Sequence, residues 1–163
     1  MTSRSSTETP RFRQLVDTPI GWLAVVADAT AIVTIEFDAQ TKPDDVSNTV
    51  TQAGVQQLQE YFQGLRTTFD LPLKMPGTQF QQQVWRTLIA VPFGVTCSYS
   101  DIATRIDRPK AVRAVGAANG KNPIPIVVPC HRIIGSSGTL TGYAGGLDKK
   151  QWLLAHEGLT VKR

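Results

Sequence analysis

A Pro- and Gly-containing segment, residues 70–77, constrains the fold of this chain more than any other feature. Two prolines and a glycine within it remove backbone donors and disfavour both helix and strand, which is typical of a linker. The 163 residues are enough for a small unit on each side of it, but not for a large multidomain protein. We therefore predict one domain over residues 1–75 and a second over residues 76–163.

Before the linker, three short alternating or apolar stretches are typical of strands. They cover residues 12–17, 22–27 and 32–37, and turn-forming residues separate them. Residues 47–64 change to helical spacing, with apolar positions at Val55, Leu58 and Phe62. We expect a small antiparallel sheet with a helix packed on it.

Helical periodicity dominates the segment after the linker. An apolar stripe that begins at Phe80 is ended by the Pro-Phe-Gly of residues 92–94. A Ser-x-x-Asp capping signal at Ser98 starts a short helix, residues 107–109 break it, and residues 110–119 form another. Two short helices joined by a tight turn make a helix-turn-helix candidate, although such pairs are usually core packing.

Residues 120–146 contain 6 Gly and 3 Pro, too many for a helix, and predict a site built from loops. At its centre, the apolar run 124–128 leads to Cys130, His131 and Arg132. Residues 148–157 then predict an amphipathic final helix, with Leu147, Trp152 and Leu153 beside Lys149 and Lys150. The expected fold class is α+β: a small sheet domain followed by a mostly helical domain.

Charge is unevenly divided between the two predicted domains. The first has a net charge of −3 and the second +7, which together give the +4 of the whole chain. A basic domain favours a polyanion such as nucleic acid, because Lys and Arg release counterions from a phosphate backbone. A basic surface with no partner is the alternative.

The second helix of the helix-turn-helix candidate is poor in side chains that read bases. Small residues such as Ala114 and Gly116 dominate it, and only Arg113 and Asn119 could reach out. Such a helix allows close backbone approach, and a lone Arg can occupy a narrow groove or the space between bases. If DNA binds here, we expect recognition that is largely independent of sequence; the alternative is close helix packing.

We expect a cytoplasmic protein without a membrane segment. No apolar run approaches the roughly 18 residues of a membrane helix, and residues 1–14 lack the apolar stretch of a signal peptide. In a reducing compartment, Cys97 and Cys130 are expected to be free thiols. Cys97 has no neighbouring base or cation in the sequence, which favours an inert, packed thiol.

Cys130 is the candidate nucleophile, since a thiol becomes strongly nucleophilic when a base removes its proton. In an extended strand His131 would point away from it, so cooperation requires a turn or a water. Glu157 is the first candidate to orient His131 and Asp148 the second. A structural cysteine is an equally good interpretation from the residues alone.

A metal site is disfavoured. Cys97, Cys130, His131 and His156 do not have the paired spacing of structural zinc sites. We predict neither a metal nor another cofactor.

Three motifs resemble one family closely. Residues 122–132 are Asn-Pro-Ile-Pro-Ile-Val-Val-Pro-Cys-His-Arg, residues 142–146 are Gly-Tyr-Ala-Gly-Gly, and residues 152–158 are Trp-Leu-Leu-Ala-His-Glu-Gly. They resemble the O6-alkylguanine-DNA alkyltransferases, also called methylated-DNA–protein-cysteine methyltransferases. The resemblance covers residues 80–158, and the pattern before residue 76 is consistent with the family's more variable N-terminal domain.

The resemblance implies catalytic roles for five residues. The alkyl acceptor falls on Cys130, the water-linked histidine on His131, the glutamate that holds it on Glu157 and the hinge asparagine on Asn122. The tyrosine that helps guanine to leave falls on Tyr99.

The resemblance also implies binding roles. The arginine finger falls on Arg113, in a helix-turn-helix that lies in the minor groove. Tyr143 and Ala144 border the base pocket, and the backbone at Cys130 and Ile133 contacts the guanine edge. Some relatives have serine where this chain has Ala144, so that side-chain contact is absent here. The zinc cluster of some relatives has no counterpart, because residues 1–96 contain neither Cys nor His.

The expected function is therefore direct repair of double-stranded DNA. The protein would extrude an O6-alkylguanine and transfer the alkyl group irreversibly to Cys130, so that each molecule acts once. The expected state is a monomer, with cooperative assembly on DNA left open. A lesion-binding protein without chemistry and a cysteine hydrolase are the alternatives; the first needs no thiol, and the second would turn over.

Overall fold

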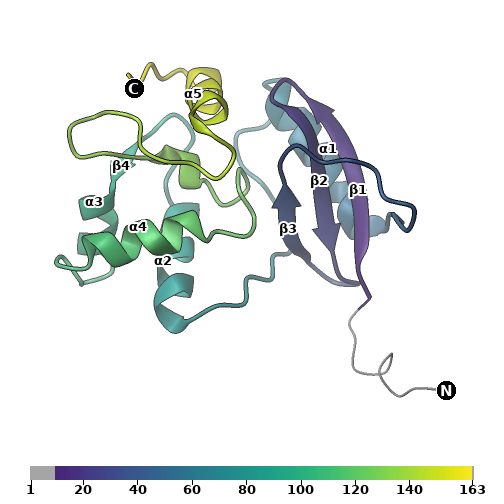
Figure 1. Cartoon of the computed structure of the whole chain (residues 1–163), viewed down its shortest axis with the longest axis horizontal. Coiled ribbons are helices and arrows are strands. Elements are labelled where there is room, and N and C mark those ends of the chain that lie inside the picture. The colour runs from purple at the N-terminus through teal and green to yellow at the C-terminus, as the bar shows by residue number, and fades with distance from the viewer. Residues whose placement is uncertain (1–9, 163) are drawn as a thin grey trace. The chain divides into compact units, whose positions relative to one another are not determined.

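The computed structural model describes residues 10–162, which form two compact units (Figure 1). One comprises the described residues up to Lys74, and the other runs from Met75 onward. The fold is α+β, as predicted: the first unit contains an antiparallel sheet with a helix, and the second is mostly helical.

The sheet of the first unit has the order β1-β2-β3, and both neighbouring pairs are antiparallel. Its strands are β1 (Phe12–Thr18), β2 (Gly21–Ala27) and β3 (Ile32–Glu36), which confirms the three predicted strands with small shifts at their ends. Gly21 closes the tight turn between β1 and β2 with φ of 106°, a left-handed backbone that favours glycine.

Helix α1 (Thr49–Phe62) packs on the sheet and lies within the predicted residues 47–64. It begins where Asn48 accepts a hydrogen bond from the backbone N–H of Thr51, while the Thr51 hydroxyl accepts one from the backbone of Asn48. This reciprocal cap satisfies N–H groups that a helix start leaves unpaired. The buried side of α1 includes Val55, Leu58 and Tyr61.

The end of the first unit is tied to the sheet. The backbone of Ile32 donates to the carbonyl of Pro72 and accepts from the N–H of Lys74. The Lys74 ammonium also lies 2.5 Å from the buried carboxylate of Asp28, which accepts two backbone N–H groups from the turn between β2 and β3. These bonds hold the chain in the first unit until just before Met75.

Three helices of the second unit confirm the predicted helical segments: α2 (Gln79–Ile89), α3 (Tyr99–Arg105) and α4 (Val112–Gly120). Ser98 caps α3, as its Ser-x-x-Asp signal predicts. A tight turn joins α3 to α4, and the two helices pack on each other and on α2. Trp85 of α2 is buried, and its indole N–H donates to a carbonyl of α4 at 2.9 Å.

The second unit also contains a single turn of 3-10 helix, η2 (Cys130–Arg132). Strands β4 (Cys97–Ser98) and β5 (Ile133–Ile134) form a short parallel pair that the sequence did not predict. Helix α5 (Leu147–His156) confirms the predicted final helix. Apolar packing beside α5 involves Leu140, Leu154 and Val161.

Among residues 10–162, the helices are all too short or too polar to cross a membrane.

Candidate active site

Cys130 lies at the start of η2, and its side chain is almost fully buried. The segment before it is a compact turn: the amide of Asn122 donates to the carbonyl of Val128 at 2.8 Å and accepts from the N–H of Ile124 at 3.0 Å. Ile126, in the same turn, has φ of 75°, a strained value for a β-branched residue. Asn122 therefore holds the backbone that presents Cys130.

His131 and Glu157 form a buried pair, with Nε2 and Oε2 2.8 Å apart. The η2 turn thus brings Glu157 to His131, and Asp148 does not take this place. Arg132 donates to both carboxylate oxygens of Glu157, at 2.8 and 3.0 Å, and the N–H of Gly94 donates to Oε1 at 3.2 Å. His131, Arg132 and Gly94 thus hold the carboxylate of Glu157 in a buried site.

This geometry fixes the tautomer of His131. A carboxylate can only accept, so Nε2 carries the proton that bonds to Glu157. Burial lowers the pKa of His131 although Glu157 acts in the opposite direction, which favours the neutral ring. Its Nδ1 then has a free lone pair, and this buried atom has no hydrogen-bond partner in the described part of the chain. Neutral His131 can therefore accept a proton at Nδ1.

Burial raises the pKa of the Cys130 thiol to about 11, while the Asn122 amide and the charge of Lys150 act to lower it. The resting residue is therefore a protonated thiol at neutral pH. Burial also lowers the pKa of Lys150 to about 8, so Lys150 still carries its charge at neutral pH and favours a thiolate nearby. The thiol is therefore not ionised at rest, and the nearby charge of Lys150 favours its thiolate.

Lys150 is completely buried, a position that the predicted amphipathic pattern of this helix did not assign to it. Its ammonium donates to the carbonyl of Ile133 at 2.6 Å, and to the carbonyl and hydroxyl of Thr141 at 3.2 and 3.3 Å. The Thr141 hydroxyl lies 2.6 Å from that of Tyr99. A signal for this burial was present, because Lys150 shares helical spacing with Leu153 and Glu157.

The residues expected to contact the base and the DNA differ in how far they are buried. Ile133 is buried, and its N–H donates to the carbonyl of Cys130. Tyr143 is half-buried and Ala144 exposed, both in the loop before α5. Arg113 and Ala114 are exposed on α4.

Gly116 lies against the ring of Tyr99: a Cβ added there would be 3.8 Å from the ring atoms. A methyl group at this position would make an ordinary contact with the ring of Tyr99, the tyrosine predicted to help the guanine to leave.

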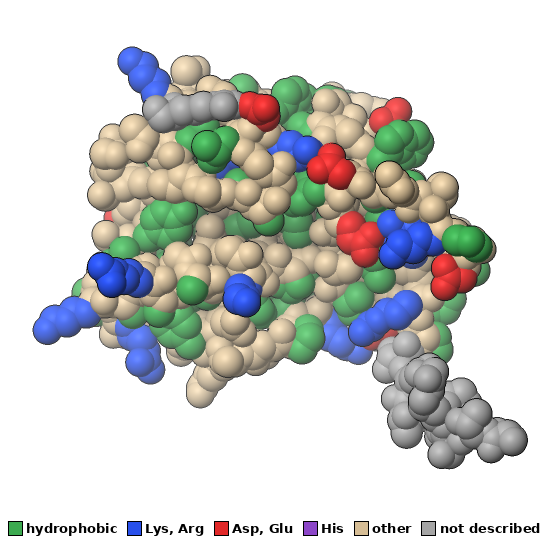
Figure 2. Space-filling view, in the orientation of Figure 1, with side chains coloured by type: hydrophobic (Ala, Val, Ile, Leu, Met, Phe, Trp, Pro, Cys, Tyr) green, Lys and Arg blue, Asp and Glu red, His purple; other side chains and the backbone are tan. Residues whose placement is uncertain are grey.

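Figure 2 shows Lys and Arg side chains gathered over the α3 and α4 part of the second unit. The exposed basic residues of these helices and their turn are Arg105, Arg108, Lys110 and Arg113.

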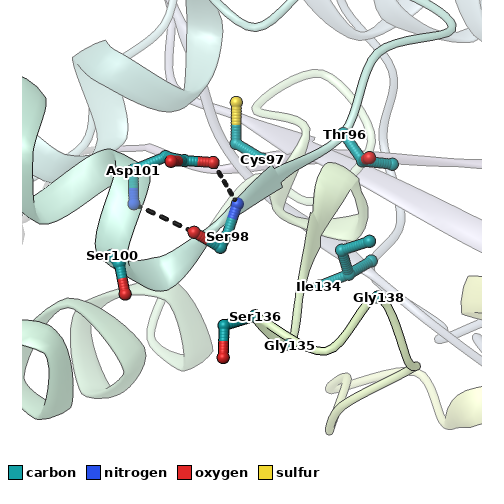
Figure 3. Close-up of a pocket in the computed structure, with 9 residues that line it drawn as sticks. All are labelled: Thr96, Cys97, Ser98, Ser100, Asp101, Ile134, Gly135, Ser136 and Gly138. Atoms are coloured by element: carbon teal, nitrogen blue, oxygen red, sulfur yellow. Dashed lines mark hydrogen bonds between the residues drawn. The ribbon is translucent and has the colours of Figure 1, made fainter.

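Cys97 is also buried, in β4, where it lines a polar pocket (Figure 3). Ser98 and Asp101, at this pocket, are joined by the two bonds of the α3 cap, drawn as dashed lines. Across the described residues, no three Cys, His, Asp or Glu side chains gather as a metal site would require.

Comparisons with known proteins extend over both units. Residues 12–75 match the model of the 6-O-methylguanine DNA methyltransferase ribonuclease-like domain, and residues 79–159 match that of the DNA-binding domain of the same proteins. A methylated-DNA–protein-cysteine methyltransferase of Mycolicibacterium paratuberculosis is 50% identical over 147 residues, covering 87% of this chain and 89% of the relative. One of Shigella flexneri is 56% identical over 103 residues, covering 63% of this chain and 60% of the relative.

Solved structures show the same fold. The Mycobacterium tuberculosis O6-methylguanine methyltransferase superposes with a TM-score of 0.82 and 42% identity, covering 91% of this chain and 93% of that one. The M. tuberculosis OGT solved in complex with DNA also gives 0.82, at 41% identity over 93% of this chain and 95% of that one. The chain therefore belongs to the methylated-DNA–protein-cysteine methyltransferase family.

Proposed function

We propose that this protein repairs alkylated DNA by moving the alkyl group from O6 of guanine to the sulfur of Cys130. One observation carries the proposal: a buried thiol at Cys130 adjoins His131, a neutral base that Glu157 orients. Membership of a family whose relatives bear the name of this reaction supports it.

The reaction is a single displacement in which atoms and charge balance. The thiol proton of Cys130 passes through one water to Nδ1 of His131, and the thiolate attacks the alkyl carbon. The S–C bond forms as the C–O6 bond breaks, so the guanine leaves as an anion. Tyr99 donates a hydrogen bond to the departing base, and the proton taken up by His131 returns to the guanine through solvent. No cofactor is needed for this balance.

The positive charge of Lys150 stabilises the thiolate during the reaction, and the high resting pKa of Cys130 protects the thiol at other times. A thioether is stable and the site offers no group to cleave it. Each molecule therefore repairs one lesion and is then spent.

DNA is bound through the second unit. Its net positive charge and exposed basic side chains suit a phosphate backbone, and a similar M. tuberculosis protein has been solved with DNA. An alkyl group on O6 is inaccessible within the stack, so the nucleotide must rotate out of the duplex. We propose that the small residues of α4 approach the minor groove and that the exposed Arg113 fills the space left by the base.

The proposal is tested by substituting each cysteine in turn. With duplex DNA that carries an isotopically labelled O6-methylguanine, Cys97→Ala should take up label as the unaltered protein does, and Cys130→Ala should take up none. Both variants should bind the DNA normally. Label retained by Cys130→Ala, or lost in Cys97→Ala with normal folding, would overturn the assignment.

A further inference from the structure

Thr141 joins two groups that the reaction uses. Its hydroxyl lies 2.6 Å from the phenol oxygen of Tyr99 and 3.3 Å from the ammonium of Lys150. It is located in the loop between β5 and α5, whereas Tyr99 opens α3 and Lys150 belongs to α5. A single hydroxyl thus connects the helix-turn-helix, the active-site loop and the final helix.

Chemistry fixes the donor at the Lys150 end of this chain of bonds. A lysine ammonium only donates, so the Thr141 oxygen accepts from Lys150 and must direct its own proton elsewhere. In the 2.6 Å bond between the Thr141 hydroxyl and the Tyr99 phenol, either oxygen can be the donor. When Thr141 donates, the bonds run from Lys150 to Thr141 to Tyr99, and the Tyr99 proton is left available for another acceptor.

Packing fixes the three groups in place. Lys150 is fully buried, and two backbone carbonyls besides the Thr141 hydroxyl hold its ammonium. A Cβ added to Gly135 would lie only 3.3 Å from the methyl carbon of Thr141, so the loop packs closely against this side chain. The Tyr99 ring lies beside Gly116 of α4. The hydroxyl cannot move far without breaking these contacts.

We propose that Thr141 is a positioning residue for the alkyl transfer: it donates to Tyr99, so that the phenol proton points to the leaving guanine. The inference rests on the proposed function, because Tyr99 needs a departing base to donate to. Charge from Lys150 polarises the Thr141 hydroxyl and makes it a better donor. Without Thr141, the phenol can turn and its proton is no longer aimed at the base.

The test compares isosteric and conservative variants in single-turnover transfer from duplex DNA with O6-methylguanine. Thr141→Val keeps the shape but loses the hydroxyl, and should slow the transfer step roughly tenfold with unchanged DNA affinity, about the value of one hydrogen bond. Thr141→Ser keeps the donor and should restore most of the rate. Thr139→Val, in the same loop, is the matched control and should react normally.

A double-mutant cycle separates positioning from a structural role. If Thr141 acts through Tyr99, Thr141→Val should cause almost no further loss in a Tyr99→Phe background. Equal losses in both backgrounds would overturn the proposal, as would a normal rate for Thr141→Val or no recovery with Thr141→Ser. If Thr141→Val has a lower unfolding midpoint, Thr141→Ala takes its place in the cycle. Failure of the unaltered protein to transfer any methyl group would refute the proposed function itself, and the inference with it.

Discussion

Glu157 is a buried carboxylate that depends on its donors. Arg132 makes two hydrogen bonds to it, and His131 and the backbone of Gly94 make one each. Buried ion pairs contribute little net stability, but removing one charge leaves the other buried and unpaired. Arg132 also donates to the carbonyl of Val91, so the network connects η2 to the end of α2 as well as to the end of α5.

Glu157→Gln tests this network. The uncharged amide leaves the Arg132 guanidinium without its counter-ion and turns an N–H₂ group toward a donor. We expect a loss of about 3–5 kcal/mol in the free energy of unfolding by urea, together with slower alkyl transfer. The half-exposed pair of Glu60 and Arg66 provides the control, since Glu60→Gln should cost at most about 1 kcal/mol. Similar small losses for both variants would contradict this account of Glu157.

The protonation state of Cys130 can be measured by thiolate absorbance. Burial raises its pKa to about 11, so the thiolate absorbance of the unaltered protein minus that of Cys130→Ser should appear only in strongly alkaline solution. Circular dichroism at each pH confirms that the protein is folded. A thiolate signal already present at neutral pH would show that the free protein holds an ionised nucleophile, contrary to this account.

Sequence reasoning reached some of these residues and not others. Cys130, His131 and Glu157 could be proposed because their types suit one chemistry. Structural roles for Lys150 and Arg132 could not be proposed from the sequence. A lysine in an amphipathic helix is usually solvated, and an arginine next to a histidine forms no distinctive pattern. Their roles come from acceptors distant in the sequence, the carbonyls of Ile133 and Val91. Only the fold brings these partners together.

Among the elements, α1 packs unusually closely on the sheet. A Cβ added to Gly54 would lie 2.9 Å from a methyl carbon of Val25 and 3.0 Å from one of Ile32. Gly54 therefore allows the helix backbone to approach strands β2 and β3. The absent side chain sets the distance between helix and sheet.

Gly54→Ala should consequently destabilise the protein, although alanine is the better helix former by about 1 kcal/mol. The overpacked methyl group should outweigh this gain and leave a net loss of about 1–2 kcal/mol in chemical denaturation. Gln59→Ala, at an exposed position of the same helix, should change stability by no more than about 0.5 kcal/mol. A stabilised Gly54→Ala variant would show that the helix can move away from the sheet at little cost.

The bond that ties the end of the first unit to its sheet has a pH signature. The Lys74 ammonium and two backbone N–H groups hold the pKa of Asp28 well below its ordinary value. A depressed carboxylate pKa adds stability above the unfolded-state pKa of about 3.9, and this stability is lost as the pH falls below it. The stability difference between the unaltered protein and Asp28→Asn should therefore be full at neutral pH and shrink in acid. A stability difference that stays the same from neutral to acid pH would contradict this account of Asp28.

Element prediction succeeded where a pattern was long or capped. The strands and α1 follow from periodicity, and the start of α3 follows from Ser98 and its capping partner. The parallel pair of β4 and β5 was missed because each strand has only two residues and its partner is distant in the sequence. The 3-10 turn at Cys130 was foreseen only as a condition for His131 to act, since Pro129 permits a turn without specifying one.

In the molecule as a whole, the excess of basic residues and the proposed site occur in the same unit. The second unit holds the basic surface over α3 and α4, and it also holds Cys130 with its buried network. The proposed DNA-binding surface and the proposed reactive site therefore belong to one compact half of the chain. The first unit contributes none of the proposed site residues.

Irreversible transfer to Cys130 is tested most directly by mass spectrometry of the intact protein and its peptides after mixing with excess duplex DNA that contains O6-methylguanine. We expect one added methyl group per molecule, located on the Cys130 peptide, and one guanine restored for each protein. An unmodified protein that still binds the lesion would indicate a binding protein without chemistry. Loss of more than one lesion per molecule would indicate true turnover, and either result would contradict irreversible transfer to Cys130.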